Sequence, residues 1–356
     1  LFIMAIGAVG KRKYIYILLC SLLCIMSVKP LAITGSSRLI VVGKIIIDEY
    51  GKPDNENELT ISIGGGGPQA AFGAALALAS LSKEAMSEPP ARQPIIFVAP
   101  VGDDWKESDT VALTDMLGDA IESIEILKGS GFRTPRIQLW HDDDQCIQWR
   151  ALHDSFGPEG ADGLWATRPS ADDILSIMEK QGGFNTFSCH VILEGGVNGA
   201  GKGGDVRFLH DDAVQKKVSF LGVEPVAFPD ETGKVSNEDA KSIVSRLEKL
   251  SATAKFISPD DEIFQAVDPS FWSKYEVASR QGPKGSVVFD KGKPSMIPVA
   301  ILDTLDGEPI NPTGAGNSYS GAMTALRSAG VSLEEAACIA SAVGAVFCEY
   351  KHIPPW

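Results

Sequence analysis

The sequence lacks most of the features that would assign it to a specialised class of protein. None of its 6 cysteines forms a Cys-x-x-Cys pair and no histidine cluster accompanies them, which argues against structural zinc. A length of 356 residues rules out a small disulfide scaffold. We find no Asn-x-Ser/Thr acceptor with a permitted middle residue and no internal repeat. Buried free thiols in a reducing compartment are therefore the simplest interpretation.

Positive charge is also scarce. The chain has 32 Lys and Arg against 46 Asp and Glu, which gives a formal net charge of −14. Nucleic acids and anionic membranes repel such an acidic surface, so we expect neither as a partner of the mature domain. An anionic small molecule would have to be held by local devices such as backbone amides, because no general positive field attracts it.

An apolar run stands near the N-terminus. Basic residues at 11–13 precede an apolar stretch at 14–28, which is short for a membrane span but typical of the core of a signal peptide. If translation began at Met26, this stretch would largely vanish. We therefore leave residues 1–36 out of the fold reasoning. We expect a cytoplasmic protein, with targeting to an organelle or the secretory route as the alternative.

From Arg38 onward, short apolar runs alternate with helix-like stretches. The predicted strands are 39–47, 95–100, 136–140, 190–194, 218–223, 255–257, 286–289 and 295–299. The predicted helices are 69–81, 110–117, 171–179, 211–217, 237–251, 316–328 and 333–350. Several strands are apolar throughout, as in a parallel sheet covered on both faces. The alternation predicts a three-layer α/β/α domain over 37–356 with a central, mostly parallel sheet.

A glycine-rich turn precedes the helix predicted at 316–328. It reads Asn311-Pro312-Thr313-Gly314-Ala315-Gly316-Asn317. Small residues at a helix start let several backbone N–H groups point at one anion, and the helix dipole adds to the attraction. On physical grounds alone, a helix cap without a ligand is an equally good interpretation.

This turn closely resembles the second signature of the PfkB (ribokinase-like) carbohydrate kinases, Asp-Thr-x-Gly-Ala-Gly-Asp. It looks most similar to a divergent branch found in fungi and plants. The resemblance implies that Gly314, Ala315 and Gly316 form the anion hole for the transferred phosphoryl group, with Thr313 beside the nucleotide. Asn317 falls on the position of the catalytic Asp, and Asn311 falls on the leading Asp.

Other stretches resemble the same family in the right order. Asp48, at the end of the first predicted strand, matches a residue that contacts sugar hydroxyls. Gly65 and Gly66 match the first signature and are implied to bind the substrate, although Ala70 stands where the family often has Asn. The segments 48–62 and 133–150 correspond to a small β lid, and relatives often form homodimers through it.

Two further segments are implied to serve the nucleotide. Gly282 and Gly285 match a turn that borders the adenine nucleotide. Asp260 and Glu262 match a segment near magnesium, with imperfect spacing. The resemblance therefore implies ATP and Mg²⁺ as cofactors and a small molecule as substrate, and it spans roughly residues 38–352.

A competing glycine motif lies at 196–203. It nearly spells a P-loop, but Gly203 follows Lys202 where a P-loop has the Ser or Thr that holds magnesium. Gly204 and Asp205 also delay any helix, which removes the amide cradle. A flexible loop is the favoured interpretation, with a P-loop NTPase as the alternative.

Asn317 bears directly on the predicted activity. An Asn side chain cannot accept a proton at neutral pH, although it can orient a hydroxyl. Loss of a general base typically costs about 10²–10⁴-fold, which leaves some turnover. We therefore predict a slow ATP-dependent phosphotransferase acting on a hydroxyl of a sugar or sugar-like molecule, with a catalytically silent nucleotide- or sugar-binding protein as the alternative. The 5 histidines show no ligand spacing and are assigned no role.

Overall fold

The computed structural model describes most of the chain after the signal-like segment. The described residues are 38–51, 60–81, 92–141, 147–152, 168–194, 204–227, 235–250, 254–290, 292–299, 312–348, 353 and 356. Residues 1–36, Asn311 and the P-loop-like stretch 196–203 lie outside them. Within the part that is described, no helix is both long and apolar enough to span a bilayer.

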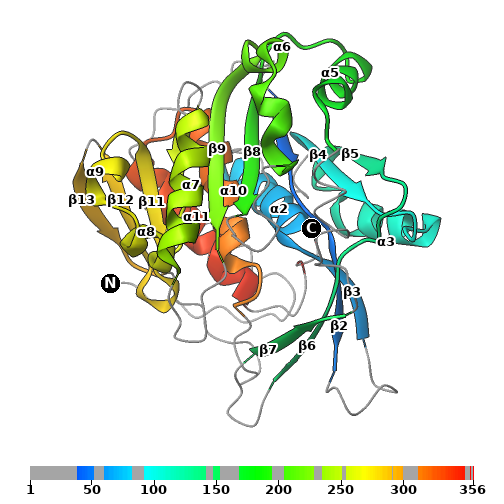
Figure 1. The fold of residues 1–356 in the computed structure, drawn as a ribbon, viewed down its shortest axis with the longest axis horizontal. Coiled ribbons are helices and arrows are strands. Elements are labelled where there is room, and N and C mark those ends of the chain that lie inside the picture. The colour runs from blue at the N-terminus through cyan, green and yellow to red at the C-terminus, as the bar shows by residue number, and fades with distance from the viewer. Residues whose placement is uncertain are drawn as a thin grey trace, which may run out of the picture.

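A nine-stranded sheet forms the centre of the molecule, in the order β13-β12-β11-β10-β9-β8-β1-β4-β5 (Figure 1). Its strands are β1 (Arg38–Val42), β4 (Gln93–Val101), β5 (Ile121–Lys128), β8 (Phe187–Glu194), β9 (Val218–Val226), β10 (Ala254–Ile257), β11 (Glu276–Arg280), β12 (Ser286–Asp290) and β13 (Lys293–Ile297). Pairing is parallel from β5 through β11, and β12 and β13 are antiparallel. The direction of winding reverses beside β1, which is where open α/β sheets bind ligands.

Helices cover both faces of this sheet (Figure 1). They are α2 (Gly66–Ser80), α3 (Glu107–Leu117), α5 (Ala171–Lys180), α6 (Asp212–Gln215), α7 (Asn237–Lys249), α8 (Asp261–Ala266), α9 (Pro269–Trp272), α10 (Ala315–Ser328) and α11 (Leu333–Cys348), with short 3-10 helices η4 (Gly204–His210) and η5 (Gly282–Lys284). One core contains α2, α3, α10 and α11, and a separate core contains α5, α6, α7, α8 and α9. The predicted three-layer α/β/α fold with a mostly parallel sheet is confirmed.

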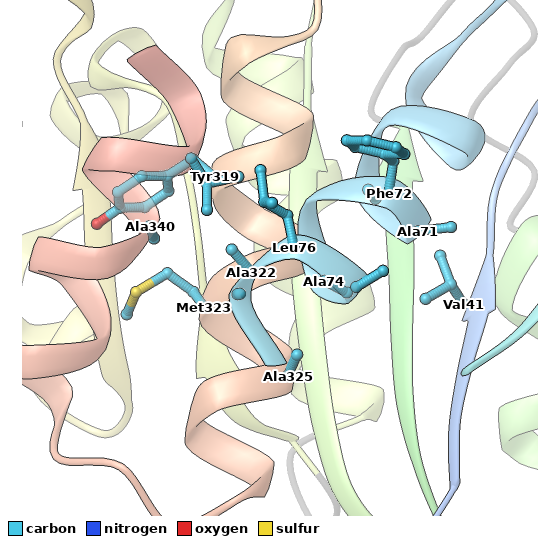
Figure 2. Close-up of a cluster of buried hydrophobic side chains, with 14 of the residues drawn as sticks. Val41, Ala71, Phe72, Ala74, Leu76, Tyr319, Ala322, Met323, Ala325 and Ala340 are labelled. Atoms are coloured by element: carbon cyan, nitrogen blue, oxygen red, sulfur yellow. The ribbon is translucent and has the colours of Figure 1, made fainter. Parts of the chain in front are cut away.

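Helices α2 and α10 pack together closely, side by side in an alanine-rich core (Figure 2). A Cβ atom added to Gly73 of α2 would clash with the backbone of Ser318. One added to Gly321 of α10 would clash with the backbone of Ala70. Because both contacts require a missing side chain, these glycines fix how α2 and α10 sit against each other, and hence where their N-termini lie.

A second, four-stranded sheet has the order β3-β2-β6-β7 and projects from one end of the large sheet (Figure 1). Its strands are β2 (Ile46–Tyr50), β3 (Thr60–Gly64), β6 (Arg136–His141) and β7 (Ile147–Ala151). These strands overlap the two segments, 48–62 and 133–150, for which a lid was predicted. That the sheet acts as a lid, and that copies of the chain pair through it, stay predictions.

The sequence prediction of one strand at 39–47 is wrong. The chain leaves β1 after Val42 and enters β2 of the other sheet at Ile46, so one apolar run supplies strands to two sheets. Periodicity could not find this break, because the residues on both sides of it are apolar. Four strands and two helices were not predicted, namely β3, β5, β7, β11, α8 and α9.

Candidate active site

Two helices are each preceded by a glycine with a positive φ. Gly65 precedes α2 with φ 93°, and Gly314 precedes α10 with φ 86°. Residues with a Cβ rarely adopt such angles, so both turns depend on glycine. Neither helix start has a side-chain cap. The first N–H groups of each helix are therefore left for other partners.

The backbone bonds at the start of α10 show which donors remain. The amide of Ala315 donates to the carbonyl of Pro312 at 3.1 Å, and the amide of Ser318 donates to Gly314 at 2.9 Å. Between them, the amides of Gly316 and Asn317 make no backbone hydrogen bond to any residue that the structure describes. Two adjacent donors at the positive end of a long helix form a cradle suited to an anion.

Asn317 connects the two helix starts. A Cβ atom added to Gly66 would clash with Asn317 Nδ2. Next to this contact, a Cβ on Gly314 would lie 2.6 Å from the amide carbon of Gln69, a residue in the first turn of α2. The two predicted glycine motifs, 250 residues apart (316 − 66) in sequence, are thus adjacent in space.

Asp48 lies on the other side of the first glycine run. It is in β2, paired with Ser62, and a Cβ added to Gly64 would clash with its carboxylate. Its side chain is buried, and burial raises the pKa of this carboxyl to about 7. Asp48 therefore contacts Gly64 while Asn317 contacts Gly66, so the two polar side chains flank one segment of three residues.

Arg280 meets the turn from the sheet side. It ends β11, and a Cβ added to Gly316 would lie 2.5 Å from its Nη1 atom. The same Nη1 donates to Glu224 Oε1 of β9 at 2.7 Å. The turn that contains Gly282 and Gly285 follows Arg280 directly, closed by a hydrogen bond from the Gln281 amide to the Gly285 carbonyl at 2.8 Å. Both predicted nucleotide-binding glycines therefore lie on the loop that begins at Arg280.

A buried polar layer lies behind Arg280. Glu224 and His190 are both fully buried, with Glu224 Oε2 and His190 Nε2 3.8 Å apart. His190 Nδ1 lies 2.9 Å from the Thr324 hydroxyl, which itself donates to the Ser320 carbonyl.

Asp260 and Glu262, the predicted magnesium residues, lie at the start of α8. Asp260 Oδ1 accepts a hydrogen bond from the Ile263 amide at 2.8 Å and so caps the helix. Burial raises the pKa of Asp260, while the charge of Arg280 opposes this effect. Glu262 is exposed in the first turn. Among the described residues, no three His, Cys, Asp or Glu side chains gather as a metal site.

The structure brings most of the predicted site residues to one region. Thr313 and Ala315 belong to the same turn as Gly314, whose neighbours are described above. Sequence reasoning missed Gln69, His190, Glu224 and Arg280. Two of these missed residues carried a usable signal, because His190 and Glu224 lie in the largely apolar strands β8 and β9, where charged groups are normally paired.

Comparison with family models gives one match, to the C-terminal part of the chain. Residues 259–353 match the family model described as pfkB family carbohydrate kinase. This segment contains Asp260, Arg280, both glycines of the β11–β12 turn and the start of α10. No curated protein matches the chain.

Solved structures resemble nearly the whole chain at low sequence identity. Ribokinase from Arabidopsis thaliana, complexed with ribose and ATP, has a TM-score of 0.57 at 17% identity, covering 90% of this chain and 95% of that one. A nucleoside kinase of the ribokinase family from Methanocaldococcus jannaschii has a TM-score of 0.54 at 17% identity, covering 90% and 94%. Ribokinase from Thermotoga maritima has a TM-score of 0.55 at 14% identity, covering 89% and 95%. The protein therefore has a ribokinase-like α/β fold, and its C-terminal segment matches the pfkB carbohydrate kinase family.

Proposed function

We propose that this protein transfers the γ-phosphoryl group of ATP to a hydroxyl of a sugar or sugar-like small molecule. The observation that carries this proposal is the meeting of two uncapped helix starts at Gly66 and Asn317. Phosphoryl transfer depends mainly on alignment and on neutralising charge, and converging backbone amides supply both.

The residues divide between phosphate and acceptor. The amides of Gly316 and Asn317, with Gly314 and Ala315 shaping the turn, hold the phosphoryl oxygens. Asp48 accepts hydrogen bonds from acceptor hydroxyls. Alongside it, Gly65 and Gly66 leave room for the acceptor against the backbone. Thr313, Gly282 and Gly285 border the nucleotide.

The acidic residues fit magnesium only in part. Asp260 uses one oxygen to cap α8, and the other oxygen has no hydrogen-bond partner among the described residues. A single carboxylate beside substrate phosphates is a common way to bind Mg²⁺, which retains several waters. We assign Asp260 this role, with Glu262 as an outer carboxylate. Bound magnesium would neutralise charge on the phosphates.

Removal of the proton from the acceptor hydroxyl is the step that limits the proposed reaction. The hydroxyl oxygen forms a bond to the γ-phosphorus as the bond to the ADP oxygen breaks, and the hydroxyl proton passes to water or to an oxygen of the transferred phosphoryl group. The Asn317 amide cannot take this proton. Catalysis is therefore slow, by about 10²–10⁴-fold relative to a site with a base. The same observation favours a second candidate function, a binding protein for nucleotide or sugar that does not turn over.

A coupled ATP-turnover assay over a panel of sugars and nucleosides tests the proposal. We expect acceptor-dependent ADP release that exceeds that of a Gly314→Val variant. Ligand-induced thermal stabilisation without any product would select the binding protein instead. Absence of both turnover and nucleotide binding would contradict the kinase-like function altogether.

A further inference from the structure

We propose that Arg280 is a phosphate-binding residue, which supplies the positive charge at the turn of Gly314–Gly316. This inference rests on the proposed function and deepens it, because it names the side chain that complements the backbone amides. The motif resemblance assigns no role to this arginine. Its place follows from contacts between three elements that are distant in sequence, namely β11, β9 and α10.

The first support is position. Arg280 Nη1 lies against the Cα of Gly316, so that an added Cβ would be 2.5 Å from it. The Gly316 amide is one of the two donors at the start of α10 that have no backbone partner among the described residues. An oxyanion bound by that amide would therefore lie beside the guanidinium.

The second support is how firmly the arginine is held. Its own amide donates to the Pro259 carbonyl at 2.9 Å, which fixes the end of β11 against the segment before α8. Its Nη1 donates to Glu224, whose side chain is 0% exposed, while the arginine side chain keeps 14% of its surface exposed. The acid thus lies behind the guanidinium, and the guanidinium lies between the acid and the more open turn.

The third support is the capacity that remains on the guanidinium. Arg280 Nε is buried and has no hydrogen-bond partner in the described part of the chain. No hydrogen bond from Nη2 to a described residue is found either. Arginine presents its donors as a planar fork that suits phosphate oxygens, so an arginine bonded through one nitrogen can still bind an anion.

A purely structural ion pair explains these facts less well. Burying a charge pair costs desolvation, and apolar residues of similar size often serve stability as well or better. A structural role also does not explain why the Arg280 guanidinium lies at the start of α10, where the positive end of the helix dipole repels it. An anion bound between the guanidinium and the start of α10 removes this repulsion. In a chain with net charge −14, a fixed local cation also offsets the unfavourable field that a nucleotide meets.

The ligand class follows from this geometry. The backbone amides of Gly316 and Asn317 and the guanidinium of Arg280 all suit phosphate oxygens. None of them is placed to recognise a base or a sugar. Arg280 should therefore strengthen the binding of nucleoside di- and triphosphates while leaving the binding of the nucleoside unchanged. The difference between ADP and adenosine affinity isolates this contribution.

The test compares two variants that differ only at residue 280. Glu224→Gln keeps Arg280 and an acceptor oxygen for Nη1. Arg280→Gln combined with Glu224→Gln removes the guanidinium without leaving an unpaired carboxylate, which is the change most harmful to folding. Arg92→Gln, at an exposed arginine paired with Asp119, is the matched control for charge. Calorimetry measures the affinity of each protein for ADP and for adenosine.

We expect the double variant to bind ADP about 10- to 100-fold more weakly than Glu224→Gln does, with adenosine affinity equal in both and Arg92→Gln like wild type. If wild type binds ADP and the double variant binds it equally well, Arg280 has no phosphate role, although the proposed function stands. If wild type binds no nucleotide, the proposed function fails and this inference fails with it. Equal losses for ADP and adenosine would also overturn it, because they would indicate a structural effect.

Discussion

The two glycine-rich helix starts both follow a glycine with positive φ but differ in the charge beside them. Gly65 and Gly314 have nearly the same φ, and neither helix has a side-chain cap. A buried carboxylate, Asp48, lies beside the start of α2, whereas a guanidinium, Arg280, lies beside the start of α10. At the start of α10 the amides of Gly316 and Asn317 have no backbone partner among the described residues, whereas at the start of α2 the Gly67 amide donates to the Lys44 carbonyl and Pro68 has no N–H. The difference in side chains divides one site into a half suited to hydroxyl groups and a half suited to phosphate.

The largest expected effect comes from restoring a base between the two halves. In Asn317→Asp, one carboxylate oxygen takes the place of Nδ2 against Gly66 and can accept the proton of an acceptor hydroxyl. We expect turnover to rise by about 10²–10⁴-fold, with ADP affinity little changed. Single-turnover kinetics with the best acceptor of the panel measure it. A rate that stays at the wild-type value would mean that Asn317 is not at the transferred proton.

The next effect concerns the charge of Asp48. Because the folded protein raises its pKa to about 7, the folded state holds this proton more tightly than the unfolded state between about pH 4 and pH 7. Stability due to this group therefore falls as pH rises through that window. The total loss is on the order of 4 kcal/mol, which Asp48→Asn removes.

Thermal unfolding from pH 4 to pH 8 tests this sign. The Asp48→Asn variant should gain stability relative to wild type as pH rises. Asp103→Asn is an instructive control, because a hydrogen bond from the Gly131 amide lowers the pKa of Asp103, so this group titrates below pH 4 and the variant should run parallel to wild type over this range. Parallel curves for wild type and Asp48→Asn would show that Asp48 does not carry a raised pKa.

Much of the architecture could be predicted, because it depends on local patterns. Alternating apolar runs and helices indicated the parallel sheet, and the glycine motifs indicated both helix starts. The pairing of Gly66 with Asn317 was implied only by the resemblance, since nothing local connects residues so far apart. Arg280 could not be placed at Gly316 at all, because that contact depends on the order of strands β9 to β11. Strand β11 itself was missed, since its sequence Glu-Val-Ala-Ser-Arg is too polar to read as a buried strand.

A smaller effect is expected from adding a methyl group where Gly66 contacts Asn317, between the two halves of the site. In Gly66→Ala, the new methyl group displaces the Asn317 side chain but leaves the amides of α10 in place. We expect turnover to fall about 10- to 100-fold while ADP affinity remains within about twofold of wild type. Turnover and calorimetry measured on the same variant separate the effect on catalysis from the effect on ADP affinity. A large loss of ADP affinity would show that the halves are not independent.

The smallest effect concerns the charge behind Arg280. Glu224→Gln removes a buried negative charge that opposes phosphate binding, while its amide oxygen still accepts from Nη1. ADP affinity should therefore rise about 3- to 10-fold at low salt, with a steeper dependence on salt concentration. An unchanged or weaker affinity would contradict the assignment of the α10 side as the phosphate half.

The most direct test of the account is a crystal structure of the protein soaked with ADP and magnesium. We predict a phosphate oxygen within about 3 Å of the amides of Gly316 and Asn317, on the side of Arg280. A phosphate group bound elsewhere, with the start of α10 in contact only with water, would contradict it.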